Sequence, residues 1–585
     1  MNVRLLVLSA LVGMMLCCAG ENIPTSEFPA SRNTEEVRIV LKAEPPTLNP
    51  LLSVRSDTRY VAEHIFQTLN HQDPQTYELN PALASVPTVT SLPDGGIAYD
   101  YRLDSMARWP NGSRVTFDDV VFSLKAMLNP LVIDAGPYRG YYSMISDVVM
   151  TGTDSLAFRV ITKRPYVLSA EAIGDMYVFP RYAYDPDGLM DEVSISALTD
   201  SESADSISEA NANMRRFADD FSLRESGNDP EGIVGSGPYR LESWKSGQRI
   251  RLRLRQDYWA KDRKEEYLTA VPEVLTFEIM SENTTTANAL RDQFVDVVID
   301  MPIDQFLVLR EEEYLKPIYD FVSIPSYKFY SILFNQNEPI LSDSLTRRGL
   351  AHMVDVDLLI QNFFPGLAQR ITGPVLPSKE YYNNELVPIT FDLDKTRKLL
   401  AEAGWSDTDG NGILDRQVNG DKQELSFDLL TFTNPVMEGI CLYIAQTAAK
   451  VGVDIQVIRQ ESRTLVDKLN TGQFTASFYG LQFEPNPNDF TQGWHSTSVP
   501  PSGTNRGYFH NTEADSLIRQ IAATTDSVAR APLYHRFQQI VYENQPMIFL
   551  YSPNATLVIA KRLDYSLTPL APNLYFNAIR VRPTS

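Results

Sequence analysis

The chain has 585 residues, of which 43% are hydrophobic and 22% are charged, and its formal net charge is −22. These proportions are those of an ordinary globular protein and exclude a disordered or fibrous chain. The acidic balance repels phosphate backbones, so no nucleic acid is expected as a partner. At this length, two or three domains are expected rather than one core.

The first 18 residues have the pattern of an export signal. Arg4 precedes an apolar run that is too short to span a bilayer permanently. The run ends in Cys17 and Cys18 instead of small residues, which resembles a bacterial lipoprotein signal with the lipid on Cys18. Acylation of Cys17, or plain secretion without a lipid, stays open. Residues 19–36 are rich in Asn, Ser, Thr, Pro and Glu, which predicts a tether.

The folded part is predicted to begin with a strand at 37–41, where apolar and polar residues alternate. The strand runs into a loop at 43–50, whose prolines disfavour helix. An amphipathic helix is predicted at 57–69. A second helix begins after Thr116, because Asp119 three residues later completes a capping box ahead of an apolar stripe.

Residues 232–259, GIVGSGPYRLESWKSGQRIRLRLRQDYW, predict a hairpin. Turn residues at 245–248 precede a strict polar–apolar alternation at 249–255, which is the period of a half-buried strand. The four arginines of this alternation are predicted to form a solvated strand face, paired with acids such as Glu242.

The rest of the chain predicts mixed α/β structure. Residues 190–230 are predicted to be a surface insertion, helical near 210–221. Asp394 is predicted to cap a helix at 395–403 that Gly404 ends. The other predicted elements are a helix at 283–294, a strand at 295–299, a strand–helix–strand unit at 425–432, 437–451 and 453–458, helices at 515–521 and 530–542, and a strand at 546–551.

Five motifs, in order along the chain, resemble signatures of one family. They are AEPPTLNP at 43–50, WPNGSRVTFDDVVFS at 109–123, the GSGPY hairpin at 235–259, the F-N…P…D…R…A…D order at 334–355, and YGLQFEPNPNDF at 479–490. On these residues the chain resembles the family 5 extracellular solute-binding proteins. These are the oligopeptide-, dipeptide- and nickel-type substrate-binding lipoproteins of bacterial ABC importers.

The resemblance implies an α/β, bilobal periplasmic-binding-protein-like fold (type II, cluster C) with an extra small domain. Lobe I would be discontinuous and built from residues 37–75, 178–290 and 546–585. A small domain II would be inserted at 76–177, and lobe III would occupy 291–545. A peptide would be trapped between lobes I and III and handed to the ABC permease and ATPase subunits. The protein would be a monomer of the periplasm, held to the membrane only by its lipid.

The same resemblance implies where the ligand binds. Glu484 stands where the family has the acid that meets the ligand's free ammonium, and a carboxylate there would form a charge-assisted hydrogen bond. The backbone at 480–482 could pair with an extended peptide as an added strand. The predicted ligand-binding residues are Glu484, Gly480, Leu481, Gln482, Phe483, Glu44, Pro46, Arg506 and Tyr508. Solvated roles for Glu484 and Arg506 stay open, as do a sugar, a nickel chelate or haem as the ligand.

One loop has part of a calcium-binding pattern. Its oxygen-bearing residues, at loop positions 1, 3, 5 and 9, are Asp407, Asp409, Asn411 and Asp415. Gly412 occupies the sixth position, as calcium loops require, but Val418 stands where a bidentate glutamate is expected. An Asp/Gly-rich turn without metal is the alternative. No other cofactor is predicted.

The sequence offers no catalytic constellation. It lacks a Gly-x-Ser-x-Gly elbow, an HExxH pair and a Cys/His couple, so a secreted hydrolase is the weaker alternative to a binding protein. Cys441 lies among apolar residues and is predicted to be a buried small hydrophobe. The sequence therefore predicts a protein that binds its solute without transforming it.

Overall fold

The computed structural model describes residues 35–582 except 201–203, 205, 208–210, 225–230, 419 and 483–486. The predicted signal segment, with Cys17 and Cys18, lies outside the described residues, as do Phe483 and Glu484. In the part of the chain that is described, no helix is long and apolar enough to cross a membrane.

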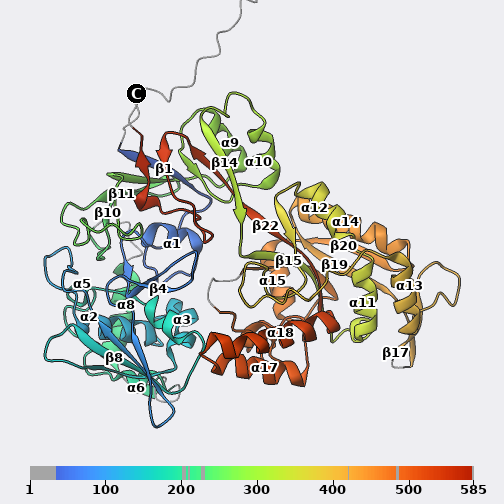
Figure 1. The fold of residues 1–585 in the computed structure, drawn as a ribbon, viewed down its shortest axis with the longest axis horizontal. Coiled ribbons are helices and arrows are strands. Elements are labelled where there is room, and N and C mark those ends of the chain that lie inside the picture. The colour runs from blue at the N-terminus through green and yellow to red at the C-terminus, as the bar shows by residue number, and fades with distance from the viewer. Residues whose placement is uncertain are drawn as a thin grey trace, which may run out of the picture.

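A sheet of 12 strands organises the molecule, in the order β10-β11-β12-β1-β13-β22-β15-β21-β19-β20, with β14 and β16 also paired to β22. The long strand β22 (Met547–Ala560) crosses the centre of the molecule (Figure 1). Its first part pairs with β15 and β16, and its last part pairs with β13 and β14. We call the strands on the β1 side the first half-sheet and those on the β15 side the second half-sheet.

The first half-sheet contains the predicted hairpin. Its strands are β1 (Glu36–Leu41), β10 (Tyr239–Lys245), β11 (Arg249–Leu254), β12 (Val274–Ile279), β13 (Val297–Val298) and β14 (Tyr319–Pro325). Strand β1 lies parallel to β12 and β13, whereas β10, β11 and β12 are antiparallel neighbours. Helices α9 (Asn283–Arg291) and α10 (Ile303–Arg310) belong to this side. The predicted domain limits stay a prediction, although pairing places β13 and β14 with this half.

The second half-sheet contains the predicted strand–helix–strand unit. Its strands are β15 (Lys328–Phe334), β16 (Ala368–Arg370), β19 (Ser426–Phe432), β20 (Asp454–Gln460) and β21 (Ala476–Gln482). Its helices are α11 (Ser344–His352), α12 (Val356–Phe363), α13 (Leu393–Glu402), α14 (Pro435–Ala449), α15 (Ser462–Asn470), α17 (Thr512–Ala523) and α18 (Ser527–Asn544). Strands β19 and β20 are parallel, as a helical crossover requires. Cys441 in α14 is buried, as predicted.

A separate four-stranded sheet, β5-β6-β8-β7, forms a body of its own. Its strands are β5 (Thr88–Ser91), β6 (Ile97–Arg102), β7 (Ile145–Met150) and β8 (Ala157–Thr162). The adjoining helices are α2 (Phe117–Leu128), α3 (Gly136–Tyr142), α4 (Ser169–Gly174) and, from the predicted insertion, α8 (Ala212–Arg224). The capping box of Thr116 and Asp119 is confirmed at the start of α2. We call the four-stranded sheet with α2, α3 and α4 the small-sheet body.

The GSGPY segment explains why the helix predicted at 57–69 was too long. Helix α1 spans only Ser56–Ala62. The carbonyl groups of His64 and Ile65, which follow it, accept hydrogen bonds from the hairpin. Gly237 N donates to Ile65 O (2.8 Å) and Tyr239 N donates to His64 O (3.0 Å). A Cβ atom on Gly235 would stand 2.0 Å from Ile65 O, so the approach requires glycine.

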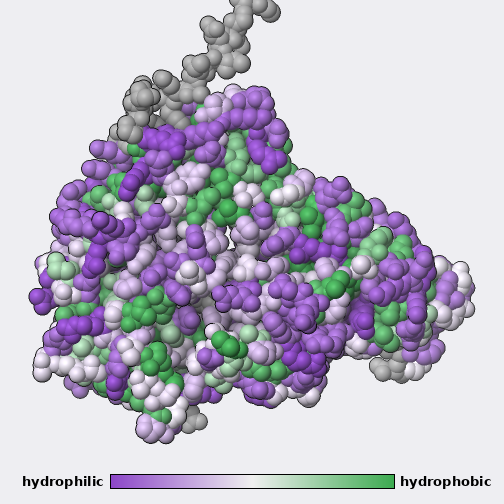
Figure 2. All heavy atoms as spheres, viewed as in Figure 1, coloured by the Kyte–Doolittle hydropathy of each residue, from purple (hydrophilic) through white to green (hydrophobic). Residues whose placement is uncertain are grey.

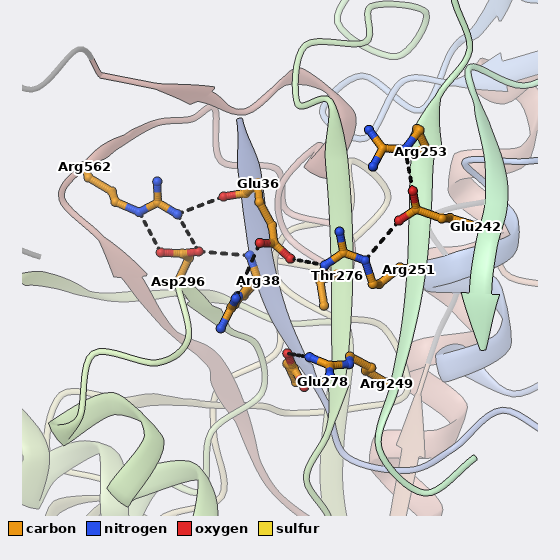
Figure 3. A network of polar contacts seen from close by, with 10 residues as sticks. All are labelled: Glu36, Arg38, Glu242, Arg249, Arg251, Arg253, Thr276, Glu278, Asp296 and Arg562. Atoms are coloured by element: carbon orange, nitrogen blue, oxygen red, sulfur yellow. Dashed lines mark hydrogen bonds and ion pairs between the residues drawn. The ribbon is translucent and has the colours of Figure 1, made fainter. Parts of the chain in front are cut away.

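Two further details correct the sequence predictions. The N-cap of α13 is Asp392, whose carboxylate accepts from Lys395 N, and not Asp394. The arginine row is only partly a solvated face. Arg251 and Arg253 both pair with Glu242, as predicted (Figure 3). Arg255 is buried instead, and it donates to the carbonyl groups of Gly235 and Gly237 within the GSGPY segment.

Charged side chains form a network across neighbouring strands of the first half-sheet, from β10 to β1 and beyond (Figure 3). Asp296, which is fully buried, accepts two hydrogen bonds from Arg562, at 2.8 and 2.7 Å. Glu36 accepts from Thr276 and Arg251. Burial alone would raise the pKa of Glu36, but this hydroxyl and the nearby guanidinium charges outweigh burial and lower it. The network therefore ties β1 to β11, β12 and the segment after β22.

Candidate functional site

The last residues of β21 form the central feature of the candidate site. Gly480, Leu481 and Gln482 pair with β15 along one edge. On the other edge, β19 pairs with β21 only at Ala476 and Ser477. In the described part of the chain, the remainder of this edge has no strand partner. Its backbone groups can therefore pair with an added extended chain, as the sequence predicted.

Close packing against the ring of Tyr330 explains why residue 480 is a glycine. A Cβ atom at this position would come within 2.7 Å of the ring of Tyr330 on β15. That ring stacks on Phe478 (5.4 Å between centroids) and contacts Tyr551, so it cannot easily move away. Because it has no side chain, residue 480 stays exposed beside this group of aromatic rings. Glycine thus keeps the open edge of β21 accessible.

The end of β21 lies at the junction of the two half-sheets. Lys328, the register partner of Gln482, forms an ion pair at 2.7 Å with Asp300, which follows β13. Burial opposes the charge on Lys328, but the attraction of Asp300 outweighs it and raises the pKa of Lys328. Asp300 has a positive φ of 52°, which is uncommon for a residue with a side chain. The junction therefore carries an ion pair on the edge of β21 that is paired with β15, opposite the open edge.

Glu44 and Pro46 lie on the other side, near the hairpin. Both carboxylate oxygens of Glu44 are engaged by the hairpin, at 2.7 Å from Trp244 Nε1, 3.1 Å from Ser246 Oγ and 3.0 Å from Gly247 N. Pro46 is exposed. Among the described residues, no hydrogen bond or ion pair joins either residue to β21. The contacts of Glu44 therefore hold its own loop, and its predicted role at the ligand stays a prediction.

Arg506 and Tyr508 lie beside β21. The Arg506 guanidinium donates to Tyr479 Oη (3.2 Å) on β21 and to Asn470 Oδ1 (2.9 Å) at the end of α15. Tyr508 has a positive φ of 54°, and its hydroxyl packs so closely on Gly472 that a Cβ there would be 2.5 Å away. The structure therefore brings Arg506 to the strand that carries the open edge, whereas Tyr508 shapes the loop that supports it.

The chain is fixed again just after the segment 483–486. Asn488 forms three hydrogen bonds. Its side-chain oxygen accepts from Tyr381 Oη (2.8 Å), its carbonyl oxygen accepts from Tyr534 Oη (2.7 Å), and its N–H donates to Tyr381 Oη (3.0 Å). The rings of these two tyrosines stack at 4.0 Å. Thus the residues flanking the predicted anchor Glu484 are positioned on both sides by packed elements of the second half-sheet.

An aromatic and cationic cluster joins the two sides of the junction. The buried Lys379 ammonium lies 5.0 Å from the ring of Tyr77 and 5.2 Å from the ring of Tyr327. Tyr77 has a positive φ of 63°, and its ring contacts that of Tyr327 edge to face at 6.0 Å. A cation between two ring faces is favourable. Sequence reasoning missed this cluster because Tyr77 is at least 250 residues from Tyr327 and Lys379, and the three residues belong to no local motif.

The loop at 407–415 brings three carboxylates together, as its spacing predicted. Lys422 Nζ lies among them, 2.8 Å from Asp409 Oδ2 and 3.3 Å from Asp415 Oδ2. Asp407 accepts instead from the backbone N–H groups of residues 410 and 412. The ammonium supplies the positive charge that an ion would bring, so the arrangement does not favour calcium. The calcium site stays a prediction.

Comparisons with known proteins agree with this fold. The profile described as "Bacterial extracellular solute-binding proteins, family 5 Middle" matches residues 78–501. The fold is that of a two-lobed binding protein, since the solved structure of the oligopeptide-binding protein AppA from Bacillus subtilis in complex with a nonapeptide superposes with a TM-score of 0.69. The two sequences are 22% identical, and the superposition covers 94% of this chain and 99% of the AppA chain. The chain belongs to the family 5 bacterial extracellular solute-binding proteins, as its motifs predicted.

Curated relatives cover most of the chain at low identity. The oligopeptide-binding protein AppA of Bacillus subtilis is 24% identical over 527 residues, which is 89% of this chain and 87% of the relative. The heme-binding protein A of Haemophilus influenzae is 22% identical over 553 residues, which is 91% of this chain and 89% of the relative. The relatives thus share the family and differ in the solute for which they are named.

Proposed function

We propose that this protein is the solute-binding component of an ABC importer and that its solute is a peptide. The observation that carries the proposal is the open edge of β21 at residues 478–482, which can accept an extended main chain. Pairing through the backbone tolerates varied side chains. The similarity to oligopeptide-binding proteins supports a peptide, and the family supports delivery to a permease without chemical change.

In this proposal Glu484 binds the α-ammonium of the peptide, as the position of this residue in the YGLQFEPNPNDF motif predicts. Arg506 offers a cation beside β21 for a carboxylate of the ligand. We further propose that the protein acts as a monomer and is anchored by a lipid on Cys18. The lipid is tested by mass spectrometry of the detergent-extracted protein, in which the acyl modification should be lost on Cys18→Ser but not on Cys17→Ser.

The solute is identified by purifying the protein without refolding, denaturing it, and analysing the released molecules by mass spectrometry. We expect peptides of narrow length. They should be lost from a Glu484→Ala variant and retained by Glu313→Ala, a matched loss of an exposed carboxylate elsewhere. Release of haem, of a sugar or of a metal chelate would refute the peptide proposal while leaving the family intact. Haem is the specific competitor because of the similarity to heme-binding protein A.

A further inference from the structure

The small-sheet body touches the C-terminal helices of the second half-sheet side directly. In the segment between β8 and α4, Val167 N donates to Ala522 O near the end of α17 (2.8 Å). The neighbouring Tyr166 donates its hydroxyl to Asp489 Oδ2 (2.8 Å). Figure 1 shows the small-sheet body, with α3, alongside α17 and α18. Two adjacent residues of one body therefore hold two different segments of the other.

The carboxylate of Asp489 is oriented for this bond. Its Oδ1 accepts from Thr491 N (2.9 Å) and Thr491 Oγ1 (2.6 Å), which leaves Oδ2 turned to Tyr166. A hydroxyl that donates to a fixed carboxylate makes a charge-assisted bond, which is stronger than one between neutral groups. Burial and the negative carboxylate both raise the pKa of Tyr166, so the hydroxyl keeps its proton.

A second pair of opposite charges lies at the same boundary. Glu171 belongs to α4 of the small-sheet body, and Arg530 belongs to α18. Glu171 Oε2 and Arg530 Nε are buried and have no hydrogen-bond partner among the described residues. Burial raises the pKa of Glu171, and the charge of Arg530 opposes this, so the two groups attract each other across the boundary. This attraction favours contact between the two bodies.

The small-sheet body is itself attached to the first half-sheet side. Tyr138 of α3 donates to Pro50 O (3.0 Å) in the loop after β1. Arg263 forms an ion pair with Asp104. Contacts of the small-sheet body with α17 and Asp489 therefore bridge the same gap that separates the two half-sheets.

We propose that Tyr166 and Val167 form a latch that holds the two sides of the molecule together, whichever solute is bound. The latch acts at Asp489, next to Asn488, and so the small-sheet body also positions the chain that follows the predicted anchor segment. Tyr166 is a positioning residue in this role. The inference rests on contacts within the protein and is independent of the peptide proposal.

The latch has its own reporter, because the amide of Val167 is protected by a bond that crosses the boundary. We expect Tyr166→Phe to accelerate hydrogen–deuterium exchange of the peptide that contains Val167 about tenfold, the loss expected for one charge-assisted bond. The exchange of β8 should not change. The radius of gyration from small-angle X-ray scattering should rise. Both measurements use the full chain without added peptide.

The matched control is Tyr142→Phe, which removes a hydroxyl bonded to Ala172 O (2.9 Å) within the small-sheet body. It should leave the exchange of Val167 and the radius of gyration unchanged. Unchanged exchange in Tyr166→Phe, or equal acceleration in both variants, would overturn the latch. If Tyr166→Phe exchanges faster in every peptide, Asp489→Asn replaces it, and the same criterion applies to the Val167 peptide.

Discussion

Substitution of Gly235 by alanine tests the contact on which the first half-sheet depends. The new Cβ would stand 2.0 Å from Ile65 O and 2.7 Å from Ile65 C, and these are backbone atoms that cannot rotate away. The hairpin and the end of α1 must therefore separate. Separation breaks the bonds from Gly237 N and Tyr239 N to the carbonyl groups after α1. It also weakens the bonds of the buried Arg255 to two carbonyl groups, at 3.2 and 3.0 Å.

The magnitude follows from these losses. Two backbone bonds at about 1 kcal/mol each, and a buried guanidinium left partly unsatisfied at about 1.5–3 kcal/mol, give roughly 3–5 kcal/mol. With an unfolding entropy of about 2.1 cal/mol/K per residue, this corresponds to a fall in melting temperature of about 2 to 4 °C for a chain of this length. Thermal unfolding followed by circular dichroism measures it.

The control is Gly140→Ala. Gly140 lies in α3, and no atom stands within 4 Å of its added Cβ, so alanine should be neutral or slightly stabilising. A Gly235→Ala protein that melts within 1 °C of the parent would refute the reasoning, because it would mean that the carbonyl groups after α1 yield without cost. The same result for both glycines would refute it equally.

Three further predictions concern the described structure. Asp296→Asn should destabilise the fold by about 3–5 kcal/mol in urea unfolding, because it leaves Arg562 without its buried partner; a loss under 1 kcal/mol would contradict this. Glu36→Gln should destabilise at pH 7, and its effect should shrink as the pH falls from the ordinary glutamate pKa of about 4.3 through the lowered pKa of Glu36, since the stability is lost when the folded state is protonated; an effect that does not change with pH would exclude this role. Asp392→Ala should cost about 1 kcal/mol as a lost N-cap, whereas Asp394→Ala should cost little; the reverse order in thermal melts would restore the original prediction.

Local patterns predicted the elements whose structure is decided locally. The alternation at 249–255 gave strand β11, and the box of Thr116 and Asp119 gave the start of α2, because both signals depend on neighbours within a few residues. The family motifs predicted the family, which the profile match confirms, and the open edge of β21 overlaps the motif at 479–490, where the ligand is predicted to bind.

Other features depend on contacts between distant residues and have no local signal. The helix predicted at 57–69 ends at Ala62 because the hairpin, more than 170 residues later, donates hydrogen bonds to the carbonyl groups of His64 and Ile65. Asp392 and Asp394 are equally good caps by sequence, and only the direction from which the chain enters α13 selects Asp392. Tyr166 and Asp489 are 323 residues apart, so no periodicity could pair them.

The way in which β22 joins the two half-sheets explains why contacts across the gap are important. The strand is buried at both ends, but Pro553 and Asn554 at its middle are only partly buried. Proline has no N–H to donate, so the ladder is weakest where the strand passes from one half to the other. Bending there costs little compared with breaking either half-sheet. The relative position of the halves must then be set by contacts outside the sheet, which is the place that Tyr166, Val167 and their partners occupy.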